Sequence, residues 1–138
     1  MEPQGPNCAI LADRHTVLSE GLRDLLETAF QTVFVVADSL TLQEGASRLL
    51  PALIVLDLAL AGRDSAQLLE EIKTLSPETR VLVLTVYDEA SVARLALLAG
   101  AHGVLLKRCI GNEFMLAVDA LLHGEEYVSP DFGLASVH

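Results

Sequence analysis

The sequence contains no tryptophan, and aromatic residues of all kinds make up only 4% of its 138 residues. Proteins that bind single-stranded nucleic acid stack the bases on exposed aromatic rings, and a flavin ring is held in a similar way. The scarcity of rings therefore argues against both kinds of binding site.

Basic residues are also scarce, because nine Lys and Arg residues stand against nineteen Asp and Glu residues, which gives a net charge of −10 at pH 7. The phosphate backbone of DNA repels a domain of this charge. We therefore expect that this chain does not itself bind nucleic acid.

Cysteines and long apolar runs are few or absent. Cys8 and Cys109 are far apart in the sequence and match no zinc-binding spacing. The first seven residues, MEPQGPN, are too short and polar for a signal peptide. No apolar run approaches the roughly 20 residues of a membrane-spanning helix. These absences predict free thiols, a cytoplasmic location and no association with membranes.

What the sequence does contain is an alternation of two kinds of apolar segment between residues 8 and 124. Continuous runs rich in leucine and β-branched residues predict strands, at 8–12, 33–37, 53–56, 81–85 and 103–107. Segments with apolar residues at helical spacing predict helices, at 16–30, 41–50, 64–75, 89–100 and 111–124.

This alternation predicts one α/β domain. Strands that are apolar on both sides form parallel sheets covered by helices on both faces. We therefore predict a flavodoxin-like, doubly wound, five-stranded parallel sheet of order 2-1-3-4-5. Residues 1–7 are expected to be a disordered N-terminus, and residues 8–124 to form the domain. Residues 125–138 show neither a helical nor a strand period and are expected to be a linker or tail.

Polar side chains follow four of the predicted strands where each strand ends, namely Asp13, Asp57, Thr85 and Lys107. Ligands of open parallel sheets bind outside the carboxyl ends of the strands, so we expect these residues to share one edge. A carboxylate can accept a phosphoryl group as a nucleophile. An ammonium and a hydroxyl can then neutralise and position the phosphoryl oxygens. The edge therefore predicts phosphoryl chemistry.

Four stretches of the sequence resemble the receiver domain of bacterial two-component response regulators of the NarL/FixJ subfamily, whose members usually carry a LuxR-type helix-turn-helix after the receiver. The stretches are ILADRH followed by EGLRDLL, LIVLDLALAGRDSAQLLEEIK, VLVLTVYDEASVARLALLAGAHGVLLK and AVDALLHGEEYVSP. The resemblance implies a CheY-like fold and a part in signal transduction and transcription regulation, not an enzymatic activity. It also implies a histidine kinase as partner, a homodimer, and contact with DNA only through a C-terminal domain not present here.

The resemblance also assigns roles to residues. It implies that Asp57 is the phospho-acceptor and that Thr85 and Lys107 bind the phosphoryl group. It implies a Mg²⁺ ion held by Asp13, Asp57 and the backbone carbonyl of Ala59.

Several positions depart from the family pattern, including Ala61, where proline is usual, and Ser65, where glycine is usual; Arg14 and Val104 bear most directly on function. Arg14 stands where a second acidic residue is usual, and Mg²⁺ requires oxygen ligands in near-octahedral geometry, so we expect weak or absent Mg²⁺ binding. Arg14 either folds over Asp57 and replaces the metal charge, or points to solvent. Val104 stands at the switch position, where a Tyr or Phe ring usually swings on activation. His15 matches a histidine that the family commonly has without a catalytic role.

These departures leave two functions open. The first is a receiver that accepts phosphate at Asp57 with an altered metal site. The alternative is a phosphorylation-independent pseudo-receiver that acts as a dimerisation module or as a module that binds a ligand or a protein partner. A phosphatase of the haloacid dehalogenase type is excluded, because that class needs an aspartate where this sequence has Ala59.

Overall fold

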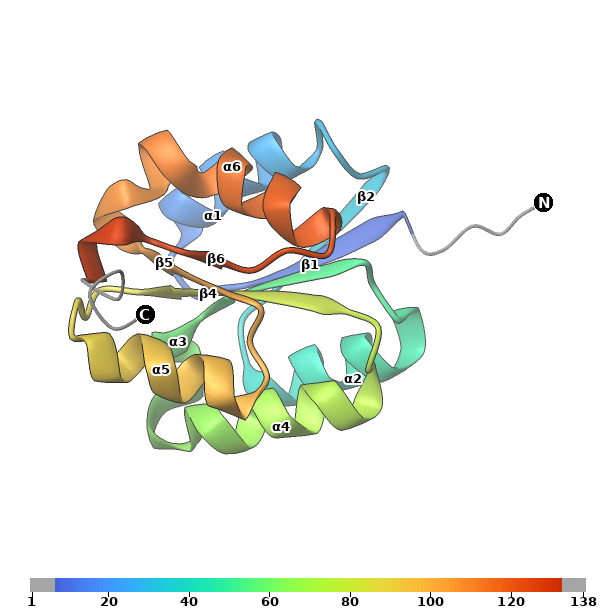
Figure 1. Ribbon diagram of the computed structural model, residues 1–138. Coiled ribbons are helices and arrows are strands. Elements are labelled where there is room, and N and C mark those ends of the chain that lie inside the picture. The colour runs from blue at the N-terminus through green and yellow to red at the C-terminus, as the bar shows by residue number, and fades with distance from the viewer. Residues whose placement is uncertain (1–6, 133–138) are drawn as a thin grey trace.

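The structure, a computed structural model, describes residues 7–132, and six parallel strands form its single sheet in the order β2-β1-β3-β4-β5-β6 (Figure 1). The strands are β1 (Cys8–Ala12), β2 (Thr32–Val36), β3 (Leu53–Asp57), β4 (Arg80–Thr85), β5 (Gly103–Leu106) and β6 (Tyr127–Val128). The α/β fold and the order of the first five strands are as the sequence predicts. Almost all of the segment expected to be disordered at the N-terminus lies outside the described residues.

Helices cover both faces of this sheet. The α-helices are α1 (Thr16–Leu26), α2 (Ser39–Leu49), α3 (Leu58–Ala61), α4 (Ser65–Leu75), α5 (Ala90–Ala99) and α6 (Ile110–Leu122). Three short 3₁₀ helices are also present: η1 (Gly62–Asp64) between α3 and α4, η2 (Lys107–Cys109) between β5 and α6, and η3 (Pro130–Phe132) after β6. Figure 1 shows α1 and α6 on one face and α2, α4 and α5 on the other.

The core consists of two apolar layers, one on each side of the sheet. Successive side chains of a strand point to opposite faces, and β1 illustrates this. Ile10 and Ala12 pack in the layer under α2, α4 and α5, whereas Ala9 and Leu11 pack in the layer under α1 and α6. The continuous apolar runs are therefore needed because both faces are buried.

Local signals in the sequence place several helix ends. The Asp38 side chain accepts a hydrogen bond from the Thr41 backbone N–H at 2.8 Å and caps α2. That helix ends at Leu49, and the next residue, Leu50, has a left-handed φ of 44° directly before Pro51. Gly100, with φ of 123°, ends α5 as the sequence predicts, because glycine adopts this conformation without a steric penalty.

The prediction of five strands is wrong by one, because β6 adds a sixth strand at the edge of the sheet. Tyr127 pairs with Gly103, and Val128 pairs with Val104, in parallel register. A strand of two residues is too short to show a period of two in the sequence. The segment after α6 is therefore folded against the domain as far as Phe132, where the described residues end.

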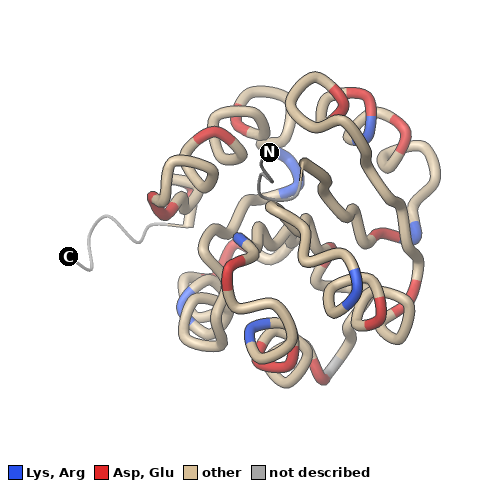
Figure 2. Tube along the Cα trace, turned by 90° about the vertical axis from the view of Figure 1, so that its right-hand side faces the viewer, with Lys and Arg blue, Asp and Glu red and all other residues tan. Residues whose placement is uncertain are grey.

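Charge is spread over the surface of the molecule. Figure 2 shows the few Lys and Arg residues dispersed among the Asp and Glu residues, without a basic face in this view. Along residues 7–132, no helix combines the length and apolar character that crossing a bilayer requires.

Candidate functional site

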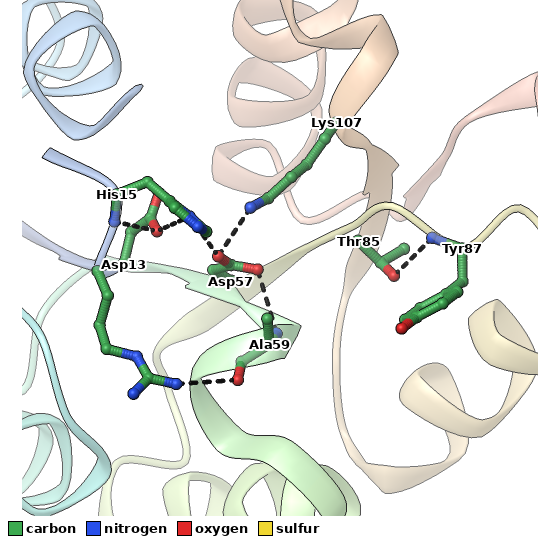
Figure 3. Close-up of polar contacts among 8 residues, drawn as sticks. Asp13, His15, Asp57, Ala59, Thr85, Tyr87 and Lys107 are labelled. Carbon is green, nitrogen blue, oxygen red and sulfur yellow. Dashed lines mark hydrogen bonds and ion pairs between the residues drawn. The ribbon is translucent and has the colours of Figure 1, made fainter. Parts of the chain in front are cut away.

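Asp57 lies at the centre of the polar edge of the sheet. It is the last residue of β3, and only 2% of its surface is exposed. Its Oδ1 accepts a hydrogen bond from the Ala59 backbone N–H at 3.1 Å. Its Oδ2 accepts one from Lys107 Nζ at 2.8 Å (Figure 3). Lys107 directly follows β5, so the ends of β3 and β5, the two strands on either side of β4, supply the two partners of this ion pair.

These contacts determine the ionisation of Asp57. Burial alone opposes the charged form of a carboxylate. The Lys107 hydrogen bond and charge, together with the Ala59 N–H, outweigh burial and hold the pKa of Asp57 below its ordinary value. Asp57 is therefore a carboxylate at neutral pH, the form that a nucleophile requires.

Asp13 and His15 approach the same carboxylate from β1. Asp13 Oδ1 accepts a hydrogen bond from the His15 backbone N–H at 3.0 Å and lies 3.1 Å from His15 Nδ1. The same Nδ1 is 3.4 Å from Asp57 Oδ2, so the imidazole bridges both carboxylates (Figure 3). Sequence analysis gave His15 no role in the site. Its position two residues after Asp13 was the available signal, since this spacing allows a side chain to bond back to the strand end.

Arg14 does not fold over Asp57, which is one of the two orientations that the sequence suggested. It is exposed to solvent, as in the other orientation, and its guanidinium Nη2 also donates a hydrogen bond to the Ala59 carbonyl oxygen at 3.4 Å. Its contact is the backbone oxygen that the family resemblance assigns to the metal.

Thr85 completes the edge at the end of β4. Its buried Oγ1 accepts a hydrogen bond from the Tyr87 backbone N–H at 3.1 Å (Figure 3). An open cleft of about 600 Å³ connects these residues, and its lining includes His15, Asp57, Ala59, Thr85, Tyr87 and Lys107. The structure thus brings together Asp57, Ala59, Thr85 and Lys107, as expected. Val104 does not line this cleft and is fully buried in the core.

The oxygen atoms available to a cation are few. Asp13, His15 and Asp57 place one potential ligand atom each within 4.8 Å of one another. Among residues 7–132, the buried Asp13 Oδ2 has no hydrogen-bond partner. Two other oxygens have cationic partners: Lys107 contacts Asp57 Oδ2, and Arg14 contacts the Ala59 carbonyl oxygen. Asp57 Oδ1 and Asp13 Oδ1 accept backbone N–H bonds from Ala59 and His15. The second carboxylate of the family pattern is missing, and an imidazole stands beside the site instead.

Comparison with known proteins agrees with this geometry. The family model of the response regulator receiver domain matches residues 9–119. Among curated proteins, the fimbriae Z protein of Salmonella typhimurium is 33% identical over 124 residues, which are 88% of this chain and 59% of that protein. The oxygen regulatory protein NreC of Staphylococcus epidermidis is 29% identical over 122 residues, covering 86% of this chain and 56% of NreC. The chain thus spans just over half the length of these relatives.

Solved structures show the same fold. A LuxR-family two-component response regulator from an Aurantimonas species superposes with a TM-score of 0.82 at 27% identity, covering 91% of each chain. The isolated REC domain of RcsB from Salmonella enterica serovar Typhimurium gives a TM-score of 0.81 at 23% identity, covering 95% of this chain and 98% of that one. At this identity the second likeness concerns the fold alone.

Proposed function

Because the chain belongs to the response regulator receiver domain family, we propose that it is a phosphorylatable switch in a two-component system that regulates transcription. The observation that carries the proposal is the contact between Asp57 Oδ2 and Lys107 Nζ at 2.8 Å, beside an open cleft. This contact supports an ionised nucleophile with a cation already placed for a phosphoryl oxygen.

The proposed chemistry is transfer of a phosphoryl group to Asp57. An oxygen of the carboxylate forms a bond to phosphorus while the bond from phosphorus to the donor nitrogen breaks. The donor nitrogen keeps the electron pair and takes up a proton. Lys107 neutralises charge on the transferred oxygens, and the Thr85 hydroxyl donates a hydrogen bond to one of them. The Thr85 oxygen accepts its hydrogen bond from the Tyr87 backbone N–H, so this contact is compatible with donation by the Thr85 hydroxyl hydrogen.

The partners that we propose follow from the family. A histidine kinase supplies the phosphoryl group, and the domain itself is not an enzyme. A structure of RcsB contains two dimers bound to two parallel DNAs, and we propose that this chain also forms a homodimer. Contact with DNA then belongs to a C-terminal domain outside this chain. We also propose a cytoplasmic location. In this proposal residues 8–124 form the receiver, and the expected tail, 125–138, is folded against it as far as Phe132.

Receiver domains bind Mg²⁺ at an acidic site, and we propose that this one binds it weakly or not at all. Of the implied oxygen donors, the Ala59 carbonyl is bonded to Arg14, and one Asp57 oxygen is bonded to Lys107. Arg14 also replaces the second acid, which changes the local charge by two units. The donor set therefore does not fit Mg²⁺, and the cations that face a phosphoryl group are protein side chains.

A second function is favoured by the same contacts. Lys107 and His15 both lie against the carboxylate of Asp57 before any phosphoryl group is present. If these contacts persist, the domain remains in one state and acts as a pseudo-receiver through dimerisation or partner binding.

The deciding experiment is labelling with phosphoramidate, with and without Mg²⁺, followed by intact mass measurement. We expect a gain of one phosphoryl group that depends little on Mg²⁺ and is absent in Asp57→Asn. Circular dichroism of each sample shows whether the protein is folded. A folded protein that takes up no label under either condition would favour the pseudo-receiver. A gain that strictly requires Mg²⁺ would contradict the altered metal site.

A further inference from the structure

The core next to β5 contains one aromatic ring that comes from outside the predicted domain. Val104, at the centre of β5, is fully buried but small. The helix that faces this layer, α5, contributes Ala93, Ala96 and Ala99. Phe132 belongs to the same buried cluster and is only 3% exposed. Since protein interiors are close-packed, the large ring supplies volume that the small side chains leave open.

Phe132 is delivered by residues 125–132, which we call the C-terminal strap. The strap pairs with one edge of β5 and bonds to it at Val104 and Leu106. Val128 pairs with Val104 in the sheet, and the Ser129 backbone N–H donates to the Val104 carbonyl at 3.0 Å. The Ser129 Oγ accepts a hydrogen bond from the Leu106 backbone N–H at 3.1 Å. Ser129 is itself buried, so these bonds are shielded from water.

The strap is also linked to the edges of the phosphoryl site. Leu106, which it holds, directly precedes Lys107, the partner of Asp57. Arg108 lies 3.3 Å from Asp131 in the strap and 3.5 Å from Asp88 in the loop between β4 and α5. These two exposed ion pairs contribute little to stability. Their value here is geometric, because they connect the strap to the loop that follows Thr85.

We propose that the C-terminal strap is a latch, a segment that can be released from the domain. The Phe132 side chain anchors it in the core beside Val104 and takes the place of the aromatic side chain missing at position 104. A ring on the strap, not on β5, then fills this space. When the contacts of Lys107 change, the strap is therefore displaced, and this displacement is the conformational change of the domain. The inference rests on the proposed function only in naming phosphorylation as the event that moves the latch. The packing of Phe132 in the core and the link of the strap to Lys107 are properties of the unphosphorylated protein.

The packing of Phe132 beside Val104 is tested by a double-mutant cycle of Val104→Phe, Phe132→Ala and both together. Two quantities are measured, the thermal midpoint and the hydrogen exchange of the Ser129 and Phe132 amides, which bond to the Val104 and Ser129 carbonyls. In Val104→Phe the new ring competes with Phe132, so the strap amides should exchange at least about tenfold faster. In the double variant the ring at 104 refills the space, so the midpoint should lie above the additive value.

Leu98→Ala is the matched control, because Leu98 lies on α5 but is 83% exposed. It should leave strap exchange unchanged. Additive midpoints in the cycle, or strap amides that remain protected in Val104→Phe, would overturn the latch.

The link to the site is tested with Lys107→Ala, read by the same strap amides without any phosphorylation. We expect their exchange to change by about threefold or more, whereas Lys73→Ala, the only other lysine of the chain, should have no effect. Unchanged exchange in Lys107→Ala would overturn the coupling. Failure of phosphoramidate labelling would instead count against the proposed function and leave these results standing.

Discussion

The guanidinium of Arg14 is bonded to the carbonyl oxygen of Ala59, at 3.4 Å, and not to the carboxylate of Asp57. A side chain that replaces an acidic residue thus occupies a backbone oxygen beside the acceptor. The first prediction follows from this contact. Arg14→Asp removes the guanidinium and adds a carboxylate, so its Mg²⁺ affinity should exceed that of the natural chain by at least roughly tenfold.

Titration with Mg²⁺, followed by the amide chemical shifts of Asp57 and Ala59, measures this change. Arg94→Asp is the matched control, since it makes the same charge change at an exposed position of α5. Equal affinities in Arg14→Asp and Arg94→Asp would mean that total charge, and not the position of Arg14, sets the metal affinity.

The second prediction concerns the ionisation of Asp57. In Lys107→Gln the main stabiliser of the carboxylate is lost while burial remains, so the pKa of Asp57 should rise. The depressed pKa contributes stability above the ordinary value of 3.8 that is lost as pH falls through the folded value. The variant should therefore lose less stability on acidification. Carboxyl carbon NMR titration measures the pKa, and an unshifted value in Lys107→Gln would contradict the proposed pairing.

The sequence predicts those features of the fold and site that depend on neighbouring residues, and it fails for contacts between residues far apart in the chain. The positions of Asp13, Asp57, Thr85 and Lys107 follow from apolar runs that end at fixed residues, because parallel strands present their carboxyl ends at one edge. The target of Arg14 did not follow, because it depends on where α3 places the Ala59 carbonyl. Side-chain direction after a strand end is set by such distant elements.

The same limit explains the two other differences. The spacing of His15 from Asp13 indicates only the local bond between these two residues. The contact of His15 with Asp57 joins the end of β1 to the end of β3, so no local pattern predicts it. β6 has only two residues, and its pairing depends on contacts with β5 and α6 rather than on its own periodicity. The resemblance to receiver domains identified the family, but the contacts of its altered positions required the structure.

The third prediction concerns His102, which lies between α5 and β5. Its Nδ1 accepts a hydrogen bond from the Val81 backbone N–H at 3.0 Å, so protonation there breaks the bond. Burial first, and then the nearby Arg80 charge, lower the pKa of His102 below 6.5. A histidine with a lowered folded pKa contributes stability above its unfolded pKa that is lost as pH falls. Stability should therefore decrease on acidification below 6.5.

Urea unfolding between about pH 5 and pH 8 measures this dependence, and His102→Asn should flatten it. His123→Asn is a control of opposite sign, because a hydrogen bond to the Asp119 carbonyl and the Asp119 charge raise the pKa of His123. Its contribution is present at low pH and is lost as pH rises. The loss of stability on acidification should therefore become larger in His123→Asn, and the same response in both variants would refute the assignment.

The fourth prediction compares Gly103, in the crowded strand β5, with Gly111, at an open position of helix α6. A Cβ at Gly103 would lie 3.0 Å from Leu82 Cδ1, Leu121 Cδ1 and the Tyr127 carbonyl oxygen. The two leucine side chains can rotate, but the backbone oxygen belongs to β6 and can move only with the strand. Gly103→Ala should therefore lower the free energy of unfolding by about 1–3 kcal/mol and speed exchange of the strap amides. Gly111, near the start of α6, has nothing within 4 Å of its Cβ position.

Gly111→Ala should thus leave the strap protected and raise the free energy of unfolding by up to about 1 kcal/mol, because alanine loses less backbone entropy in a helix. Urea unfolding of both variants gives the two signs directly. If Gly103→Ala destabilised the domain without affecting strap exchange, the leucines alone would have absorbed the new methyl group. If exchange rose as expected, the close contact of Gly103 with Tyr127 is what allows the sixth strand to lie against β5.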